Sequence, residues 1–358
     1  MMPKPVGYAV VGVGDVAQKA VIPAFSRAAD SARLVAVVAA DRARAQVAAR
    51  PHGAAAYHYD ELRQCLQRED VHAAYIAGPT STRCDYAVEA ARAGVHVLCE
   101  TPMAVMADEC RRMIRTCQTN RVKLMVAYRL PFQPASRKAL ELVQAGALGA
   151  PRTFSSDVTL RIEQPDDVRL QRRLGGGTMY DLGTAAINAA RQLFAAEAAQ
   201  VMAMTARPAR RHGGDVDESA VALIRFPEER LAHLHTSFGE ERASVFTLFG
   251  EEGYVRLTDA YHDLVASTLE LVRGGAREEL RFEPADGLAA ALAHLAECIV
   301  EDRAPEPSGV EGLQDVRIVE AIYRSARDGR PVTLPRLARV DSPPPEQDKA
   351  VGDRRQAS

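Results

Sequence analysis

The strongest constraint on the fold is a repeat of apolar, strand-like runs separated by amphipathic helical stretches, which ends at about residue 128. Five runs have the length and apolar continuity of buried strands: 6–12, 33–40, 72–78, 96–100 and 123–128. Nearly continuous apolar strands that alternate with helices indicate a parallel sheet covered on both faces. We therefore predict an α/β N-terminal domain of the Rossmann type over residues 1–128.

After a predicted helix near 133–146, the pattern changes to short strands with tight connections. These strands are predicted at 152–160, 219–226, 230–238, 243–250 and 253–258, with helices at 178–194, 286–302 and 311–328. Consecutive strands with short turns are antiparallel. We predict a second, α+β domain over 129–335 with a mostly antiparallel sheet. Residues 336–358 are rich in proline and charge and are predicted to be disordered.

Composition excludes several classes of protein. The 358 residues carry a formal net charge of −2 and no basic stripe, so no nucleic-acid partner is expected. The apolar N-terminal run is interrupted by glycine and is not followed by a cleavage site, so we expect a cytoplasmic protein without a membrane partner. Six irregularly spaced cysteines argue against a disulfide framework or a thiolate zinc site. His233 and His235 lack a third ligand at a supporting spacing, and no metal is expected.

A glycine turn follows the first predicted strand directly. The pattern Gly12-x-Gly14-x-x-Ala17 also opens a helix. Glycine at 12 allows a tight turn, glycine at 14 allows backbone to approach a pyrophosphate, and the helix start offers unpaired N–H groups. An ordinary strand-to-helix turn is the alternative. Its position at the start of a run of βαβ units favours dinucleotide binding.

The end of the second strand bears on which dinucleotide is bound. An NAD site usually has a carboxylate there for the ribose 2′-OH. Asp41 follows that strand, but it is equally suited to cap the next helix. Arg42 and Arg44 stand where a 2′-phosphate would be met, although solvated helix-surface arginines are an alternative. The sequence favours NADP over NAD.

Two further strand ends carry residues that suit a ligand. In open α/β sheets, ligands lie outside the carboxyl ends of the strands. One strand runs out into Gly78, Pro79 and Thr80, and "HVLCETPMAV" runs out into Glu100 and Thr101. We predict that these residues contact the cofactor.

Several stretches together resemble the Gfo/Idh/MocA oxidoreductases, in the branch near glucose-fructose oxidoreductase. They are the turn Gly12–Ala17 with "VIPAF", "YIAGPTSTRCDYAVEAARAGVHVLCETPMAV", "YRLPFQPASRKALELVQAGALGAPR", "LGGGTMYDLGTAAINAARQLF" and "GLQDVRIVEAIYRSARDGRPV". The resemblance implies tight NAD(P) binding, with Asp15 and Val16 in the cofactor turn, and hydride transfer at a sugar or cyclitol carbon. It also implies self-association through the sheet of the second domain, so a homodimer or homotetramer is expected.

This chain departs from the family pattern at both catalytic positions. The family's strand-end motif is Glu-Lys-Pro, whereas this chain has Glu100-Thr101-Pro102, and threonine cannot place a positive charge beside a developing alkoxide. The second motif has Gly-Gly-Gly, an Asp, and a His or Tyr four positions later. Here the glycines 175–177 lead to Asp181, and Ala185 occupies the last position.

Replacement residues are sought near the expected cleft. Asp181, Ala185 and Asn188 fall at i, i+4 and i+7, which places them on one face of an ideal helix. Tyr128 and Arg129 end the last parallel strand. We predict Asp181 and Tyr128 as catalytic residues, and Arg129, Asp181 and Asn188 as substrate contacts.

Two hypotheses about function follow. The first is an NAD(P)-dependent sugar oxidoreductase with altered or weak catalysis, since acid–base help is typically worth about 10²- to 10⁴-fold and positioning can supply as much. The second is an NAD(P)-binding pseudoenzyme with a regulatory or assembly role. The intact glycine turn favours the first, and Thr101 and Ala185 favour the second.

Overall fold

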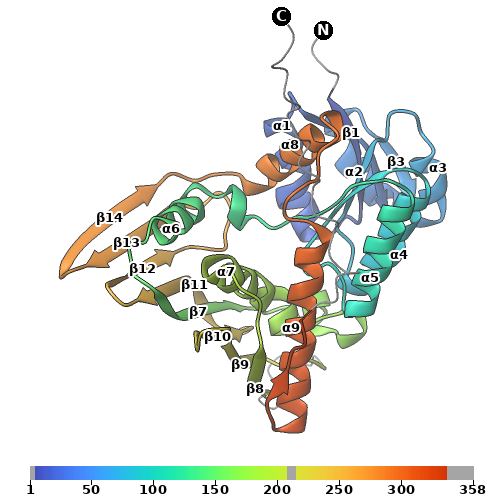
Figure 1. Ribbon diagram of the computed structural model, residues 1–358. Helices are drawn as coiled ribbons and strands as arrows, with labels where there is room; N and C mark the ends of the chain where they lie inside the picture. Colours follow the sequence, from blue (N-terminus) through green and yellow to red (C-terminus); the bar gives the residue numbers. More distant parts are fainter. Residues whose placement is uncertain (1–4, 208–214, 337–358) are drawn as a thin grey trace, which may run out of the picture.

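The computed structural model describes residues 5–207 and 215–336 and shows two domains, each built on its own sheet (Figure 1). The predicted disordered segment 336–358 lies outside the described residues except for Arg336. The parallel-sheet domain contains the N-terminal third of the chain, and the larger sheet extends away from it. The predicted fold class is confirmed in both domains.

Six parallel strands form the N-terminal sheet in the order β3-β2-β1-β4-β5-β6. The strands are β1 (Val6–Val11), β2 (Ala32–Ala39), β3 (Ala55–His58), β4 (Ala73–Ile76), β5 (His96–Cys99) and β6 (Leu124–Val126). The helices are α1 (Ile22–Arg27), α2 (Arg42–Ala49), α3 (Leu62–Leu66), α4 (Thr80–Arg92) and α5 (Ala107–Thr119). The strand order reverses between β1 and β4, and a ligand crevice is expected at that point. Strand β3 was not among the predicted strands.

Both faces of this sheet are covered, as the continuous apolar strands require. All six residues of β1 are buried. One face is covered partly by α8 (Gly287–Val300), whose Leu288, Leu292 and Leu295 join the core around β1. The Tyr8 hydroxyl donates to the Leu292 carbonyl at 2.8 Å. Helix α8 therefore packs on the first domain although it comes from the end of the chain, as Figure 1 shows beside α1.

The C-terminal sheet has nine strands in the order β14-β13-β12-β11-β7-β10-β9-β8-β15. They are β7 (Pro151–Arg161), β8 (Gln200–Ala206), β9 (Ser219–Arg225), β10 (Leu231–Ser237), β11 (Gly239–Gly250), β12 (Gly253–Thr258), β13 (Ser267–Arg273), β14 (Ala276–Phe282) and β15 (Val332–Thr333). All pairs are antiparallel except β7 with β10. Strands β8, β13, β14 and β15 were not predicted.

Helices cover one face of this sheet. They are α6 (Pro134–Gln144), the five-residue π-helix η7 (Met179–Gly183), α7 (Thr184–Phe194) and α9 (Gly309–Asp328). Helix α9 runs along both domains (Figure 1): Leu313 and Val316 belong to the first core, whereas Val319 and Ile322 belong to the second. Because α9 packs in both cores, it fixes the two sheets relative to each other.

The cysteines lie in the protein interior. All six cysteines are buried and unpaired. Burial raises the pKa of the Cys99 thiol, which lies at the end of β5, to about 12. A buried thiol with so high a pKa is unsuited to nucleophilic chemistry. Among the described helices, none combines the length and hydropathy needed to cross a membrane.

A buried polar cluster joins the domains around Asp315 of α9, which is 0% exposed. Its Oδ2 accepts hydrogen bonds from the Tyr128 hydroxyl and, at 3.0 Å, from Asn188 Nδ2. Its Oδ1 pairs with Arg191 Nη1 at 2.7 Å. Burial raises the pKa of Asp315 to about 6, against the opposing effect of Arg191. Residues that follow β6 and residues of α7 and α9 therefore meet at one carboxylate.

The raised pKa of Asp315 predicts a pH-dependent contribution to stability. The folded pKa is about 6 and the ordinary value is 3.8, so the native state binds the extra proton between these values. The stability gained is present at low pH and is lost as pH rises through about 6. Relative to Asp315→Asn, the wild type should lose up to roughly 3 kcal/mol of unfolding free energy across this window. Urea unfolding of both proteins from about pH 3 to about pH 7.5 spans the two pKa values and measures this difference, and a difference independent of pH would contradict the assignment.

Candidate active site

The glycine turn lies at the carboxyl end of β1, where the strand order reverses. Gly12 has φ +106°, and a Cβ there would lie 2.5 Å from the Gly78 nitrogen, so a side chain does not fit. A Cβ on Gly14 would meet no atom within 4 Å, so the space beside it is open. The helix starts at once, because Gln18 N donates to the Gly14 carbonyl at 3.0 Å. Main-chain amides at a helix start therefore border an open space, as phosphate binding requires.

The end of β2 carries two charged residues with separate partners. Asp41 caps α2, and its carboxylate accepts from Ala43 N at 2.8 Å. Arg42 Nη1 lies 2.9 Å from Glu61 Oε1, and both side chains are partly exposed. Glu61 also accepts from His58 N, and this backbone bond is the main cause of its lowered pKa. Of the two roles considered for Asp41, the structure shows the helix cap.

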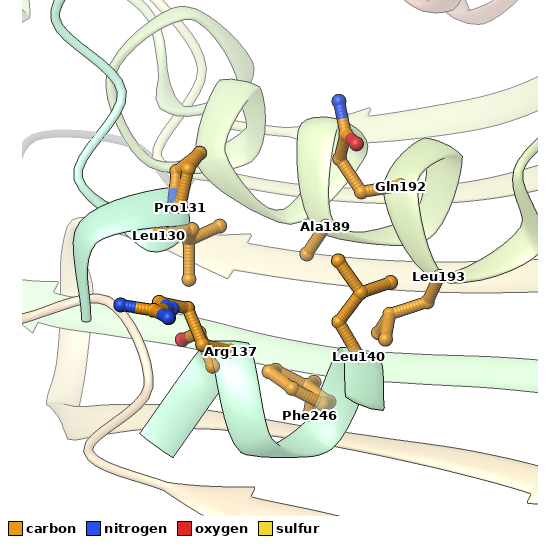
Figure 2. Close-up of a pocket in the computed structure, with 9 residues that line it drawn as sticks. Leu130, Pro131, Arg137, Leu140, Ala189, Gln192, Leu193 and Phe246 are labelled. Carbon is orange, nitrogen blue, oxygen red and sulfur yellow. The ribbon is translucent and has the colours of Figure 1, made fainter. Parts of the chain in front are cut away.

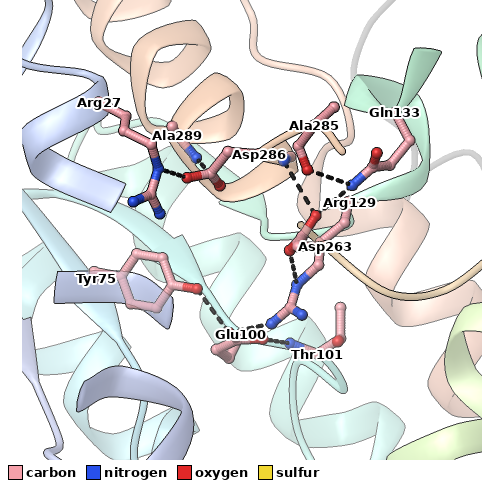
Figure 3. Close-up of polar contacts among 11 residues, drawn as sticks. Arg27, Tyr75, Glu100, Thr101, Arg129, Gln133, Asp263, Ala285, Asp286 and Ala289 are labelled. Carbon is pink, nitrogen blue, oxygen red and sulfur yellow. Dashed lines mark hydrogen bonds and ion pairs between the residues drawn. The ribbon is translucent and has the colours of Figure 1, made fainter. Parts of the chain in front are cut away.

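The residues that follow β5 form a buried hub at Glu100 (Figure 3). Glu100 is 6% exposed, and its Oε1 accepts from the Tyr75 hydroxyl at 2.7 Å. Its Oε2 accepts from Thr101 N at 3.1 Å. Burial, followed by the Glu100 charge, raises the pKa of Tyr75 well above its usual range. Glu100 is thus held by fixed donors at the end of β5, and these contacts favour a structural role for its carboxylate.

Arg129 connects this hub to the second domain. Its Nη2 lies 3.5 Å from Glu100 Oε1, and its Nε lies 3.2 Å from Asp263 Oδ2. Asp263 Oδ1 accepts from Gln133 and, at 3.1 Å, from Gly287 N at the start of α8. The guanidinium is therefore shared between two carboxylates, as Figure 3 shows. The substrate contact predicted for Arg129 stays a prediction.

The structure contradicts the roles predicted for Tyr128 and Asn188. Tyr128 is 2% exposed and Asn188 is 0% exposed, and both donate to Asp315 between the domains. The predicted common helix face assumed a regular α-helix. The π-helix at 179–183 has more residues per turn than an α-helix. Asn188 in α7 therefore does not lie on the same helix face as Asp181. Neither residue can contact a substrate in this arrangement.

Asp181 lies beside Arg169. Asp181 Oδ2 is 3.7 Å from Arg169 Nη1, and about a third (35%) of each side chain is exposed. Arg169 also forms two hydrogen bonds with Asp167, of 3.0 and 2.8 Å. Desolvation raises the pKa of Asp181, while the Arg169 charge opposes this. A carboxyl group with a raised pKa is better suited to accept and release a proton near neutral pH.

The three glycines before Asp181 have a packing role. A Cβ on Gly175 would lie 2.8 Å from the Thr80 Cβ, at the first residue of α4. One on Gly176 would lie 2.3 Å from the Arg169 carbonyl oxygen, and one on Gly177 2.4 Å from the Tyr323 hydroxyl. The glycine loop 175–177 of the second domain can therefore pack directly against the start of α4 in the first domain. Thr80 is buried by this contact, and its predicted contact with a cofactor stays a prediction.

Sequence reasoning missed Arg83, in the first turn of α4. Its Nε donates to the Gly78 carbonyl at 2.9 Å, and its Nη1 donates to the Pro102 carbonyl at 2.6 Å. Arg83 thus spans the residues that follow β4 and β5, beside Thr101. A basic residue in the first helical turn after a strand is an unusual position, because cations are disfavoured near a helix N-terminus. That unfavourable position was the signal from which the sequence could have identified Arg83 as a candidate site residue.

A separate cavity lies outside this cleft, between α6, α7 and β11 (Figure 2). Its volume is about 260 Å³, and none of the predicted site residues lines it. The lining is mostly apolar: Leu130, Pro131, Ser136, Arg137, Leu140, Ala189, Gln192, Leu193 and Phe246. The candidate active site is instead at the carboxyl ends of the parallel strands, where Gly14, Glu100 and Thr101 lie and where the charges of Glu100 and Arg83 act on Asp181.

Comparison with known proteins identifies the family. Residues 6–128 match the family model described as "Oxidoreductase family, NAD-binding Rossmann fold", and residues 136–256 match the "GFO/IDH/MocA C-terminal domain". The chain is 28% identical over 337 residues to D-xylose 1-dehydrogenase [NADP(+)] of Haloarcula marismortui, covering 92% of this chain and 93% of the relative.

Two further relatives extend over nearly the whole chain. The dTDP-3,4-didehydro-2,6-dideoxy-α-D-glucose 3-reductase of Streptomyces violaceoruber is 30% identical over 322 residues, 88% of this chain and 91% of the relative. The crystal structure of aldose-aldose oxidoreductase from Caulobacter crescentus complexed with glycerol is 32% identical, with a TM-score of 0.87, covering 92% of this chain and 100% of that one. The chain belongs to the Gfo/Idh/MocA family of oxidoreductases.

Proposed function

We propose that this protein is an NADP-dependent oxidoreductase that acts on a carbon of a sugar or cyclitol. The observation that carries the proposal is the open space beside Gly14 at the switch point of the sheet. Three similar proteins are named for reactions of an aldose or of a nucleotide-linked deoxyhexose. A cleft with several charged and polar side chains suits a ligand that presents many hydroxyl groups.

The residues of the first domain fit the cofactor. Gly14 and the following helix start would hold the pyrophosphate, because their amides border an open space. Arg42 would meet the 2′-phosphate of NADP, which favours this cofactor over NAD. The residues that follow β4 and β5, including Gly78 and Thr101, would border the nicotinamide. When bound, the nicotinamide supplies hydride transfer.

Asp181 would exchange the proton that accompanies the reaction at a hydroxyl-bearing carbon. It is retained in the cleft, its pKa is raised by desolvation, and Arg169 holds it in position. Thr101 and Ala185 carry no group that titrates near neutral pH, so catalysis should be weaker than in relatives that keep both motif residues. Loss of general acid–base help alone costs about 10²- to 10⁴-fold.

A second candidate function is an NADP-binding protein without turnover, with a regulatory or assembly role. Two changes in one site favour it, since both Thr101 and Ala185 lack the proton-transferring groups of the family motif. The two candidates share the cofactor site and differ only in whether a substrate reacts.

A substrate panel separates the two candidates. Purified protein is tested with NADP and NAD against D-xylose, other aldoses, polyols and inositols, and with NADPH against the matching ketoses, by nicotinamide absorbance. We expect slow turnover with at least one sugar, and at least about tenfold faster turnover after Thr101→Lys together with Ala185→Tyr, which restore acid–base groups. Tight NADP binding with no turnover would favour the pseudoenzyme. An unchanged rate in the double variant would contradict the explanation of weak catalysis.

Because the space beside Gly14 is open, a substitution there is predicted to weaken cofactor binding without changing the stability of the fold. Gly14→Val should leave the unfolding midpoint of the ligand-free protein nearly unchanged, because a Cβ at this position has no protein atom within 4 Å and the side chain starts in open space. The same change should weaken NADP binding by at least about tenfold, since the side chain occupies the space for the pyrophosphate. Calorimetric titration and thermal unfolding measure the two effects. Unchanged NADP affinity would show that the dinucleotide does not bind at this turn.

We also propose that the protein forms a homodimer or homotetramer through the uncovered face of the C-terminal sheet. Five apolar side chains on neighbouring strands of that face are exposed by 45% or more: Met202, Met204, Val221, Leu223 and Leu231. Met202 pairs with Leu223 and Met204 with Val221 across β8 and β9, so they form a continuous patch. Contiguous apolar patches of this kind mark interaction surfaces.

Substitution within the patch tests this proposal. Leu223→Asp places a charge at its centre and should shift the protein toward monomer in light scattering coupled to size-exclusion chromatography. Val47→Asp is the matched control, because Val47 is 76% exposed on α2 of the other domain. A wild-type monomer, or equal oligomeric states for wild type and Leu223→Asp, would contradict the proposed interface.

A further inference from the structure

Three arginines border the cleft, and they differ in how their charges are balanced. Arg129 lies between the carboxylates of Glu100 and Asp263. Arg169 pairs with Asp167 and lies 3.7 Å from Asp181.

Arg83 is bound instead by two main-chain carbonyls. Within residues 5–207 and 215–336, no carboxylate lies at ion-pair distance from it. Carbonyl oxygens fix the guanidinium without cancelling its charge.

The two carbonyls place Arg83 at the strand ends that face the cleft. Gly78 follows β4 and Pro102 follows β5, and these strands are direct neighbours in the sheet. Thr101 lies between Glu100 and Pro102, next to the arginine's second acceptor. The Nη2 group has no partner among the described residues, so both of its N–H donors and the second N–H of Nη1 remain for a ligand. The positive charge of Arg83 is therefore fixed beside Thr101, and no carboxylate of the described residues neutralises it there in an ion pair.

The electrostatic surroundings agree with this placement. Desolvation raises the pKa of Asp181, and the charges of both Arg169 and Arg83 oppose the rise. Arg83 and Asp181 therefore act on the same cleft from opposite domains. An uncompensated cation in a partly dehydrated cleft attracts an anion more strongly than one in bulk water.

We infer that Arg83 stabilises the reacting oxygen of the sugar by its positive charge and free N–H donors, the task that the neutral Thr101 cannot perform. This inference rests on the proposed oxidoreductase function. Oxidation of a hydroxyl-bearing carbon breaks its C–H and O–H bonds and forms a C=O bond: the hydride, with the electron pair of the C–H bond, would pass to the nicotinamide of NADP, and the proton would pass to Asp181. Negative charge develops on the oxygen when the proton leaves first. A fixed donor aimed at such a charge is worth about 10²- to 10³-fold in rate.

Substitution of Arg83 tests the inference by activity and by binding. Arg83→Gln should lower kcat on the sugar found in the panel by at least about 10²-fold, and Arg83→Lys, which keeps the charge, should lose much less. The affinity of the cofactor-free protein for D-gluconate, a sugar-derived anion, should fall at least about tenfold in Arg83→Gln. Its NADP affinity should stay within about threefold of wild type. Arg92→Gln, an exposed arginine on the same helix, serves as control.

A second substitution distinguishes charge from structure. If charge is the function of Arg83, then Thr101→Lys should raise kcat at least about tenfold more in the Arg83→Gln background than in the wild type, because only there does it replace a missing cation at the strand end. An active wild type with an equally active Arg83→Gln variant, or unchanged gluconate affinity, would overturn the inference. So would a loss of activity that Thr101→Lys does not relieve. If the wild type turns over no sugar, the proposed oxidoreductase function is wrong, and the inference about Arg83 fails with it.

Discussion

The ion pairs of Arg129 with Glu100 and Asp263 are the interaction on which the shape of the cleft depends most. The two carboxylate side chains are each only 8% exposed, so neither is satisfied by water. Removing one partner from a buried pair typically costs about 3–5 kcal/mol, because the remaining charges lose their compensation. Through Asp263, the same arginine also positions Gly287 at the start of α8. One side chain thus couples the end of β5, the segment after β12 and the final third of the chain.

The return of the chain to its first domain strengthens this coupling. Helix α8 contributes leucines to the core around β1, and α9 contributes to both cores. A substrate cleft formed by two domains is a precise site only if the domains keep a fixed relation. Here the cleft lies between surfaces joined by two helices, the Asp315 cluster and the glycine loop packed on α4. The positions of Asp181 and Arg83 are therefore set by large buried surfaces as well as by local hydrogen bonds.

The sequence predicted the parts of the fold that local patterns determine. Continuous apolar strands and the Gly12–Gly14 turn identified five of the six strands of the first sheet, and short strands with tight connections identified five of the nine strands of the second. The hairpin of β13 and β14 was missed although Gly274 and Gly275, both with positive φ, mark a tight turn between them. Its side chains are strongly charged, which hid the alternation. Strand β3 is only four half-buried residues long and offers little pattern.

The site was less predictable because it depends on contacts between distant segments. The role predicted for Asp181 from its motif stays a prediction, whereas Asn188 was misplaced, since no local signal distinguishes a π-helix from an α-helix at 179–183. Tyr128 was misplaced because its partner Asp315 is 187 residues away in the chain. The importance of Arg83 depends on two carbonyls that only the folded sheet brings together. Residue spacing predicts which side chains share a face of one helix or strand. The contacts described here join different helices and strands, so spacing does not predict them.

The pairing of Arg42 with Glu61 has a consequence for how the protein distinguishes its two possible cofactors. Arg42 already has an ion-pair partner, so in the proposed cofactor site a 2′-phosphate would compete with the Glu61 carboxylate for the guanidinium. Cofactor preference then equals the difference between two ion pairs, one internal and one with the ligand. Both pairs are exposed to solvent and weaken as salt increases. The free-energy difference between NADP and NAD binding would then be small, and a single substitution at Arg42 or Glu61 could reverse the preference.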